Sequence, residues 1–408
     1  MRIAIVSVGD ELLSGDTVDT NSAWLGQTFS GVGFTVLRVI VVPDDVVAIS
    51  DAIRTATAGA DAVLVQGGLG PTSDDLSREG IAAASGVPLH RDADIEKRLR
   101  AWYAERNRPV LDVSLRMADV PDGAEVLPNP PGQAPGLRTV LDGCLIYAVP
   151  GVPREMQAIV TESVLPDLIA RATARPDVLT QTLRIAVRGE SEVATLVAAG
   201  GPTPPGLRVA YLARPGDVRL RVTGPAEIEE PYAQQLRTLL GELVYGEGDD
   251  TLDVVIHRLL AAQRATLAVA ESLTGGQLGE TLTRMAGSSA TFVGGVVAYE
   301  TRLKTMLLGV DGDVLNREGA VHPDVARQMA EGVRQRLGST YGLSTTGVAG
   351  PEPADGHDPG TVYVAAAGPA GTQVRSLRLG GGRDLVRELA VVHALNLLYG
   401  ILRAGNNG

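Results

Sequence analysis

The sequence predicts an α/β protein made of more than one domain, and three observations lead to this prediction. The chain has 408 residues, and at roughly 150 residues per domain this length predicts two to three domains. Aromatic residues are only 3% of the chain, so the cores must consist of Val, Leu, Ile and Ala, a composition that suits α/β layers. Strand-like apolar runs alternate with helical segments, and glycines follow the strand ends, as in parallel α/β sheets.

The first block, residues 1–167, follows this alternation most clearly. Its predicted strands are Ile3–Val8, Thr35–Val42 and Ala62–Gln66, and its predicted helices are Thr20–Gly31 and Val46–Ala58. A Pro/Gly loop, Asn129–Gly136, then leads to a strand at Cys144–Val149 and a helix from about Arg154. Ligands of parallel sheets bind at the carboxyl ends of the strands, so the loops that follow these strands are the candidate sites.

The remainder of the chain divides into two further predicted domains. Residues 175–246 contain a predicted strand at Gln181–Val187, a helix from Glu190, and strands at Leu207–Ala213 and Val218–Thr223. The acidic, glycine-rich segment Gly246–Asp250 has the composition of a linker. The third domain, residues 249–408, begins with a helix at about Leu252.

Charge and cysteine content exclude several classes of function. The formal net charge of −12 disfavours long-range attraction to nucleic acid or an anionic membrane, although it leaves a local basic patch open. The one cysteine, Cys144, excludes an intramolecular disulfide and a multi-cysteine metal site. The N-terminal apolar run is too short for a signal peptide, and we find no stretch of about 20 apolar residues. We therefore expect a cytoplasmic protein without a membrane association.

A serine in the third domain is the first candidate for chemistry. The predicted strand Ala265–Ala270 ends in Glu271-Ser272-Leu273-Thr274-Gly275-Gly276, and a helix follows at once. A serine on such a turn exposes its hydroxyl, and the backbone N–H groups beside it can bind an oxyanion or another anion. The simpler interpretation is that Ser272 is the N-cap of the helix.

Lysine usage favours the catalytic interpretation. The chain contains only two lysines, Lys97 and Lys304, and Lys304 lies in the segment Tyr299–Lys304, close in sequence to Ser289. Arginine keeps its proton in proteins, whereas a desolvated lysine can be neutral and act as a base. A Ser–Lys pair is one way to activate a hydroxyl nucleophile. The alternative is that Lys304 is a lysine by chance.

Two glycine- and acid-containing segments follow strands of the first domain. They are Gly9-Asp10-Glu11 and the longer Gly67–Asp75, which reads GGLGPTSDD. A glycine-rich turn before a helix can hold phosphate through its backbone N–H groups, and adjacent acids can hold a divalent cation. A plain turn with an aspartate N-cap is the alternative.

Several sequence motifs together resemble one known family. AESLTGG, GSS, YETRLK, STTGVAGP and GTVYVA occur in order in the third domain, and GGLGPTSDD and PGVPREM occur in the first. They resemble the CinA family, and the resemblance covers essentially all 408 residues. It implies a molybdopterin-binding-like (MoaB/MogA-like) α/β domain, a small KH-like α+β middle domain and a C-terminal α/β amidohydrolase domain.

For the C-terminal domain, the resemblance implies hydrolysis of nicotinamide mononucleotide to the acid and ammonia without a cofactor. Ser272 would be the nucleophile and Lys304 its base. The remaining implied site residues are Tyr299, Ser289 and Thr346, which shape the site, Thr274, Gly275 and Gly276 beside the serine, and Arg383 or Arg387 at the phosphate. The chain departs from the family at Leu273, where cysteine is frequent, and in the loop after Ala349, which reads GPEPADGHDPG.

For the N-terminal domain, the resemblance implies metal-dependent hydrolysis of ADP-ribose to AMP and ribose 5-phosphate. The implied ligands of a divalent cation (Mg, Mn or Co) are Asp75, Asp74 and Glu11, with Glu155 as a weaker candidate. The implied phosphate-binding residues are Gly68, Gly70, Thr72, Ser73 and Asn21.

Two other functions stay open. The N-terminal domain could bind a molybdopterin or a nucleotide without chemistry, or the chain could be a competence-linked protein that contacts DNA. The middle domain shows no convincing basic GXXG turn, the loop with which KH domains clamp nucleotides. We therefore expect the middle domain to have a structural or dimer-forming role, the chain to be a homodimer, and nucleic acid not to be a partner.

Overall fold

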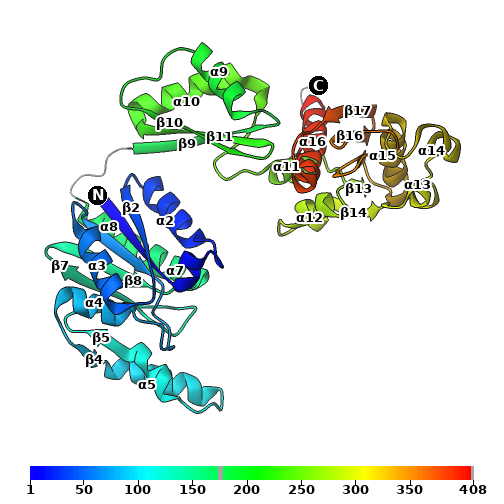
Figure 1. Ribbon diagram of the computed structural model, residues 1–408. Helices are drawn as coiled ribbons and strands as arrows, with labels where there is room; N and C mark the ends of the chain where they lie inside the picture. The colour runs from blue at the N-terminus through cyan, green and yellow to red at the C-terminus, as the bar shows by residue number, and fades with distance from the viewer. Residues whose placement is uncertain (173–177, 406–408) are drawn as a thin grey trace. The chain divides into compact units, whose positions relative to one another are not determined.

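The computed structural model describes residues 1–172 and 178–405 and divides into two compact units (Figure 1). Unit 1 is Met1–Leu179, and unit 2 is Thr180–Gly408. The start of the predicted middle domain, residues 175–177, and the last residues of the predicted third domain, 406–408, lie outside the described residues. The fold class is α/β, with mixed sheets in both units.

Unit 1 is built on a six-stranded sheet in the order β2-β1-β3-β8-β7-β6. Its strands are β1 (Arg2–Val8), β2 (Thr35–Val42), β3 (Ala62–Gln66), β6 (Glu125–Leu127), β7 (Gly136–Leu141) and β8 (Cys144–Val149). The four strands β2, β1, β3 and β8 are parallel, as expected, but β7 runs antiparallel to β8, and β6 runs antiparallel to β7. The reason is the turn Asp142-Gly143, whose residues have φ of 49° and 82°. Two such residues close a tight hairpin between β7 and β8.

Helices cover both faces of this sheet. They are α1 (Asp10–Ser14), α2 (Thr20–Gly31), α3 (Val46–Thr57), α4 (Ser77–Ser85), α7 (Pro153–Ile159) and α8 (Leu165–Arg171), with a π-helical segment at Val160–Val164. Alternate residues of β1 enter different cores: Ala4 and Val6 pack with residues of α3 and α4, whereas Ile3 and Ile5 pack with residues of α2, α7 and α8. The period-two alternation of a strand produces this division.

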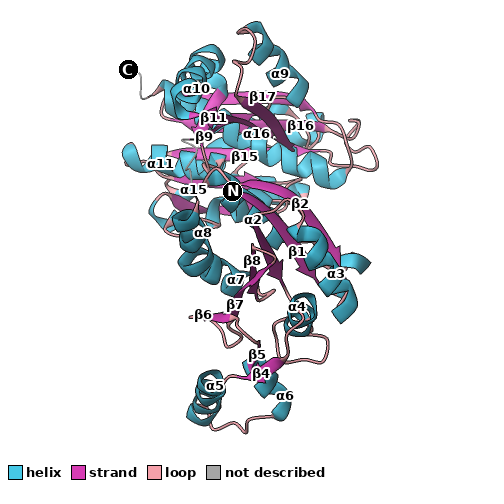
Figure 2. Ribbon diagram, turned by 90° about the vertical axis from the view of Figure 1, so that its left-hand side faces the viewer, coloured by secondary structure: helices cyan, strands magenta, loops and turns pink. Residues whose placement is uncertain are grey.

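A smaller substructure of unit 1 lies at the end of the main sheet (Figure 2). It consists of β4 (Leu89–Arg91), α5 (Ala93–Glu105), α6 (Asp112–Leu115), a 3-10 turn at Arg116–Ala118 and β5 (Asp119–Pro121), and β4 pairs with β5. Ile95 and Leu99 of α5 are buried in the same core as Ile81 of α4. This shared core attaches the substructure to the main sheet.

The first part of unit 2 is a four-stranded sheet in the order β10-β11-β9-β12. It contains β9 (Val178–Ala186), α9 (Glu190–Ala199), β10 (Arg208–Arg214), β11 (Asp217–Pro225), α10 (Ala226–Leu240), a 3-10 turn at Gly241–Leu243 and β12 (Val244–Glu247). Val218, Leu220 and Val222 alternate along β11 and pack with residues of α9 and α10. One face of this sheet is therefore covered by helices, as in an α+β domain.

The second part of unit 2 is a five-stranded sheet in the order β14-β13-β15-β16-β17. The strands β13 (Leu267–Glu271), β14 (Phe292–Val297) and β15 (Tyr341–Gly347) are parallel. Strand β16 (Thr361–Gly368) runs antiparallel to β15, and β17 (Gly371–Arg378) runs antiparallel to β16. The helices are α11 (Leu252–Ala262), α12 (Gln277–Thr283), α13 (Thr301–Leu308), α14 (Gly312–Glu318), α15 (Pro323–Leu337) and α16 (Arg383–Ala404).

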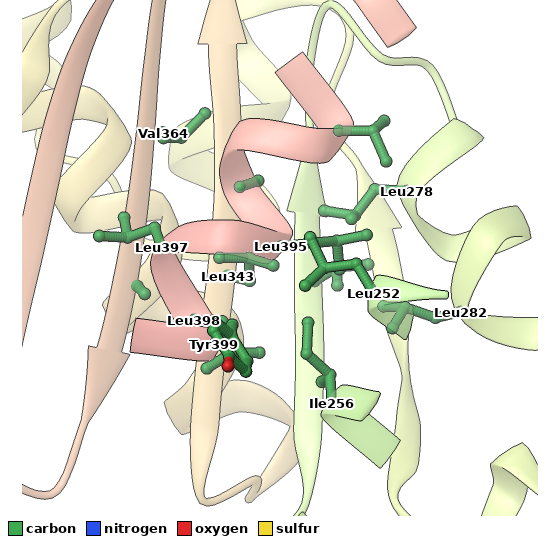
Figure 3. Close-up of a cluster of buried hydrophobic side chains, with 14 of the residues drawn as sticks. Leu252, Ile256, Leu278, Leu282, Leu343, Val364, Leu395, Leu397, Leu398 and Tyr399 are labelled. Carbon is green, nitrogen blue, oxygen red and sulfur yellow. The ribbon is translucent and has the colours of Figure 1, made fainter. Parts of the chain in front are cut away.

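Helices α11 and α16 pack on one face of this sheet (Figure 3). Leu343 and Val364 of the sheet contact a cluster that includes Ile256, Leu395 and Leu398. Helix α16 has the length and composition of a membrane span, but half of its apolar window is buried. Its place in this cluster identifies it as a core helix.

Candidate functional sites

Ser272 lies directly after β13, and the structure excludes its interpretation as a helix cap. The residue before it, Glu271, accepts hydrogen bonds from the N–H groups of Gly276, Leu278 and Gly279 at 2.9, 3.0 and 2.8 Å. The carboxylate of Glu271 thus satisfies the N-terminal donors of α12, and Ser272 makes no capping bond. The sequence analysis missed this role of Glu271. The serine side chain is free for another function.

The amine of Lys304 lies beside the hydroxyl of Ser272. Lys304 is on α13 and is 1% exposed, and its Nζ is 3.0 Å from Oγ of Ser272 and 3.0 Å from the carbonyl oxygen of Ala298. Burial lowers the pKa of Lys304 to about 8, and the carboxylate of Asp355 acts weakly in the opposite direction. A substantial fraction of Lys304 is therefore neutral near pH 8, as a base must be.

A cavity of about 240 Å³ opens over this pair, and three more of the predicted residues line it. The guanidinium of Arg383 donates to the hydroxyl of Tyr299 at 3.0 Å and to the carbonyl of Gly350 at 2.8 Å. Thr346 is buried and donates to the carbonyl of Ala320 at 2.7 Å. The cavity thus has a serine and a lysine at its base and a guanidinium at its wall.

Five predicted residues of this domain do not line the cavity. Ser289 is exposed in a 3-10 turn at Ser288–Ala290. Thr274 is buried and hydrogen-bonded to Thr345 at 2.8 Å, and Gly275 and Gly276 form the entry to α12 with φ of 59° and 102°. Arg387 donates to the carbonyls of Leu273 and Thr274 at 3.2 and 2.9 Å. Arg387 therefore stabilises the serine turn, and of the two predicted arginines only Arg383 faces the cavity.

Two acidic residues that the sequence analysis missed also line this cavity, Glu352 and Asp355. Oδ2 of Asp355 accepts a hydrogen bond from the N–H of Ala320 at 2.7 Å. Both residues belong to the irregular loop that departs from the family pattern. No periodicity predicts where the side chains of such a loop point, so only the structure could place them.

A second cavity, of about 820 Å³, lies in unit 1 at the carboxyl ends of its strands. Of the predicted residues, it is lined by Glu11, Asn21, Gly68, Gly70, Asp74, Asp75 and Glu155, whereas Thr72 and Ser73 are not among its lining residues. The amide of Asn21 donates to Gln66 at 2.9 Å and to the carbonyl of Gly151 at 2.8 Å. It therefore joins the end of β3 to the loop that follows β8, and both line the cavity.

The glycine loop of this cavity is held in place from within the protein. Asp75 accepts hydrogen bonds from the N–H of Gly70 at 2.7 Å, from the N–H of Thr72 at 2.8 Å and from the hydroxyl of Thr72. Arg78 is 2% exposed and donates to the carbonyls of Leu69 and Gly70, both at 2.6 Å. Asp75 therefore shapes the turn, but it is not the helix N-cap of the plain-turn alternative, because the N-cap of α4 is Leu76.

The predicted metal ligands of this cavity are not gathered into a ligand set. No three His, Cys, Asp or Glu side chains converge in the way a metal ion requires, within residues 1–172 and 178–405. Burial is the largest cause that raises the pKa of Asp44, and the charges of Asp10, Glu11 and Asp74 raise it further, so these acidic residues influence one another. Asp44 follows β2 and was not predicted. Oxygen donors are thus present, but the site does not fit an assembled metal centre.

Two models of known protein families match this chain, one over each of the two sites. Residues 249–402 match the family model described as the CinA C-terminal domain, and residues 4–170 match the model described as a probable molybdopterin binding domain. A CinA-like protein of Frankia casuarinae is 47% identical over 98% of this chain and 96% of its own length. The chain belongs to the CinA family.

Another full-length relative and a solved structure are also similar to parts or all of this chain. A putative competence-damage inducible protein of Moorella thermoacetica is 38% identical over 99% of both chains. The crystal structure of a CinA protein of unknown function from Thermoplasma acidophilum is 36% identical and covers 41% of this chain and 97% of its own, with a TM-score of 0.38. Family membership and the two matched domains support a nucleotide-processing enzyme.

Proposed function

We propose that the C-terminal domain hydrolyses the carboxamide of nicotinamide mononucleotide to a carboxylate and ammonia. The observation that supports this most is the 3.0 Å contact between a buried, neutralisable lysine and a serine hydroxyl at the base of a cavity. The resemblance to the family's deamidases supplies the substrate. No cofactor is needed for this chemistry.

In the proposed reaction, neutral Lys304 takes the proton of the Ser272 hydroxyl while Oγ bonds to the carboxamide carbon. The C–N bond then breaks, and the protonated Lys304 returns its proton to the departing nitrogen, which leaves as ammonia. Water attacks the resulting ester and gives a proton to Lys304; the bond from Oγ to the acyl carbon then breaks, Lys304 returns that proton to Oγ of Ser272, and the carboxylic acid product leaves. Arg383, whose planar guanidinium suits an anionic group, would hold the substrate phosphate at the cavity wall.

Mass-spectrometric analysis of products tests the proposal. Purified protein incubated with nicotinamide mononucleotide should yield nicotinic acid mononucleotide and one equivalent of ammonia. Ser272→Ala should abolish both products, and Ser289→Ala, at the exposed serine, should retain them if Ser272 is the nucleophile. Release of free nicotinamide instead of ammonia would show that the enzyme cleaves the glycosidic bond, and would contradict the proposal.

We further propose that the N-terminal domain hydrolyses ADP-ribose to AMP and ribose 5-phosphate, giving a bifunctional enzyme of pyridine-nucleotide salvage. A cavity of about 820 Å³ is large enough for a dinucleotide-sized ligand. In its glycine loop the N–H groups of Gly67 and Gly70 are bonded within the protein, so those of Gly68 and Leu69 are the ones left for phosphates. ADP-ribose incubated with and without added Mg²⁺, Mn²⁺ or Co²⁺ tests both the activity and the predicted cation. A binding module without chemistry would leave ADP-ribose intact under every condition.

A homodimer in the cytoplasm and the absence of a nucleic-acid partner also remain our proposals. Sedimentation of the purified protein gives the oligomeric state directly. A gel shift at low and high salt tests the DNA-binding alternative, because binding to the phosphate backbone weakens steeply as salt rises.

A further inference from the structure

The lining of the N-terminal cavity includes an aromatic residue that no proposed chemistry uses. Trp102, one of two tryptophans in the chain, lies near the end of α5 and lines the same 820 Å³ cavity as the glycine loop. Arg106 also lines the cavity, and its Cζ lies 4.2 Å from the centroid of the Trp102 ring. The guanidinium thus lies over the indole face, as in a cation–π pair.

The hydrogen bonds around this pair hold it as a fixed platform. A guanidinium nitrogen of Arg106 donates to the carbonyl of Trp102 at 3.2 Å. The ring of Tyr103 packs edge-on against the indole of Trp102, with 5.0 Å between the ring centroids and an interplanar angle of 81°. The hydroxyl of Tyr103 donates a hydrogen bond to Oγ of Ser114 at 2.9 Å. The side chain of Arg106 is nevertheless 47% exposed. A planar surface is therefore both positioned and accessible.

The glycine loop Gly67–Gly70 lines the same cavity as Trp102 and Arg106. Gly68 has a φ of 61°, and a Cβ on it would lie 2.6 Å from Oγ of Ser77. A Cβ on Gly70 would lie 2.4 Å from Asp75. Both positions therefore need glycine, because a side chain there would collide with Ser77 or Asp75.

We propose that Trp102 and Arg106 form a stacking platform for the purine base of a nucleotide whose phosphates lie at the loop Gly67–Gly70. Bases stack on guanidinium planes and aromatic rings, and a base laid on Arg106 would extend the existing Arg–Trp stack. A purine offers more ring area than a pyrimidine, so the platform favours purines. The inference rests on the proposed nucleotide-binding role of this cavity but not on hydrolysis.

Calorimetric titration of the full-length wild-type protein with AMP, UMP and ribose 5-phosphate tests the platform. Stacking of one base on an aromatic surface typically changes binding by a factor of ten or more. We expect AMP to bind at least about tenfold more tightly than ribose 5-phosphate, with UMP between them. Equal affinities for AMP and ribose 5-phosphate, or binding of neither, would overturn the proposal.

Matched variants locate the effect. Arg106→Lys keeps the positive charge but removes the planar guanidinium. It should therefore weaken the binding of AMP by about five- to tenfold and leave the binding of ribose 5-phosphate unchanged. Arg100→Lys is the control, because Arg100 lies on the same helix, pairs with Glu96 at 2.6 Å and is not a lining residue. Equal weakening of AMP and ribose 5-phosphate by Arg106→Lys would assign Arg106 to the phosphates and refute stacking.

A spectroscopic measurement provides an independent readout. Trp24→Phe leaves Trp102 as the only tryptophan, and AMP should then quench its fluorescence while ribose 5-phosphate does not. If AMP binds with quenching and ADP-ribose is not hydrolysed, the platform stands and only the proposed activity fails. If ADP-ribose is hydrolysed and AMP leaves the fluorescence of Trp102 unchanged, the activity stands and the platform fails.

Discussion

Replacing Lys304 by arginine tests whether Lys304 acts as the base for Ser272 or only binds the substrate phosphate. With its pKa lowered to about 8, about half of the Lys304 amines are neutral at pH 8. A guanidinium, whose ordinary pKa exceeds 12, is neutral in about one molecule in 10⁴ or fewer at that pH. Loss of a positioned base costs about 10²–10⁴ in rate. We therefore expect Lys304→Arg to reduce kcat for nicotinamide mononucleotide by about that factor.

The pH profile and a matched control complete this test. Wild-type kcat/KM should rise about tenfold per pH unit below the pKa of Lys304 and level off above about pH 8, since only the neutral amine accepts a proton. Lys97→Arg is the control, because Lys97 is the only other lysine of the chain. Circular dichroism must show that Lys304→Arg is folded, since the buried site has to accommodate a larger side chain. A folded Lys304→Arg variant with near-wild-type kcat and a raised KM would refute the Ser–Lys mechanism.

Three further predictions follow from other contacts. Asp355→Asn removes the carboxylate that raises the pKa of Lys304, so the rising limb of the pH–rate profile for deamidation should move to lower pH by a fraction of a pH unit, and by less at high salt. A limb that is unchanged or moves to higher pH at low salt would contradict this. Asp75→Ala removes three hydrogen bonds within the glycine loop, and we expect a loss of at least about 10² in ADP-ribose hydrolysis with unchanged deamidation; parallel loss of both in folded protein would show that the sites are not independent. A fragment of residues 249–408 lacks Tyr245, whose ring packs edge-on against that of Tyr399 with 6.5 Å between the centroids, so it should melt at a lower temperature than a fragment of residues 180–408 and still catalyse deamidation. Equal melting temperatures would show that this contact contributes nothing to stability.

The sequence predicted the regular elements of both units well because their signals are local. Strands β2, β3 and β8 and helix α2 have the predicted bounds. The direction of β7 could not be predicted from apolar runs, because it depends on the two-residue turn Asp142-Gly143. A turn of this kind was a possible signal, since Asp-Gly between apolar runs favours a hairpin. The substructure of β4, α5 and β5 has no comparable apolar alternation.

The two sites differed in how far the sequence could locate their residues. At the C-terminal site, the rarity of lysine singled out Lys304, and the structure brings it to Ser272. The rarity of lysine was informative because it can be read from the sequence without knowing how the loops fold. Asp355 could not be singled out in this way, because it is one of many acidic residues in the chain and lies in an irregular loop.

In the N-terminal domain, sequence proximity of acids was a poor guide to their roles. Asp74 and Asp75 are adjacent, but Asp75 accepts hydrogen bonds from its own loop, whereas Asp74 lies exposed at the cavity and raises the pKa of Asp44 from a different strand end. Neighbouring side chains on a turn point in different directions, so adjacency does not imply a shared ligand. The carboxyl ends of parallel strands do meet at one edge of the sheet, and this is the rule that Asp44, Gly67 and Gly151 obey. Topology, more than spacing along the chain, therefore determines which residues form this cavity.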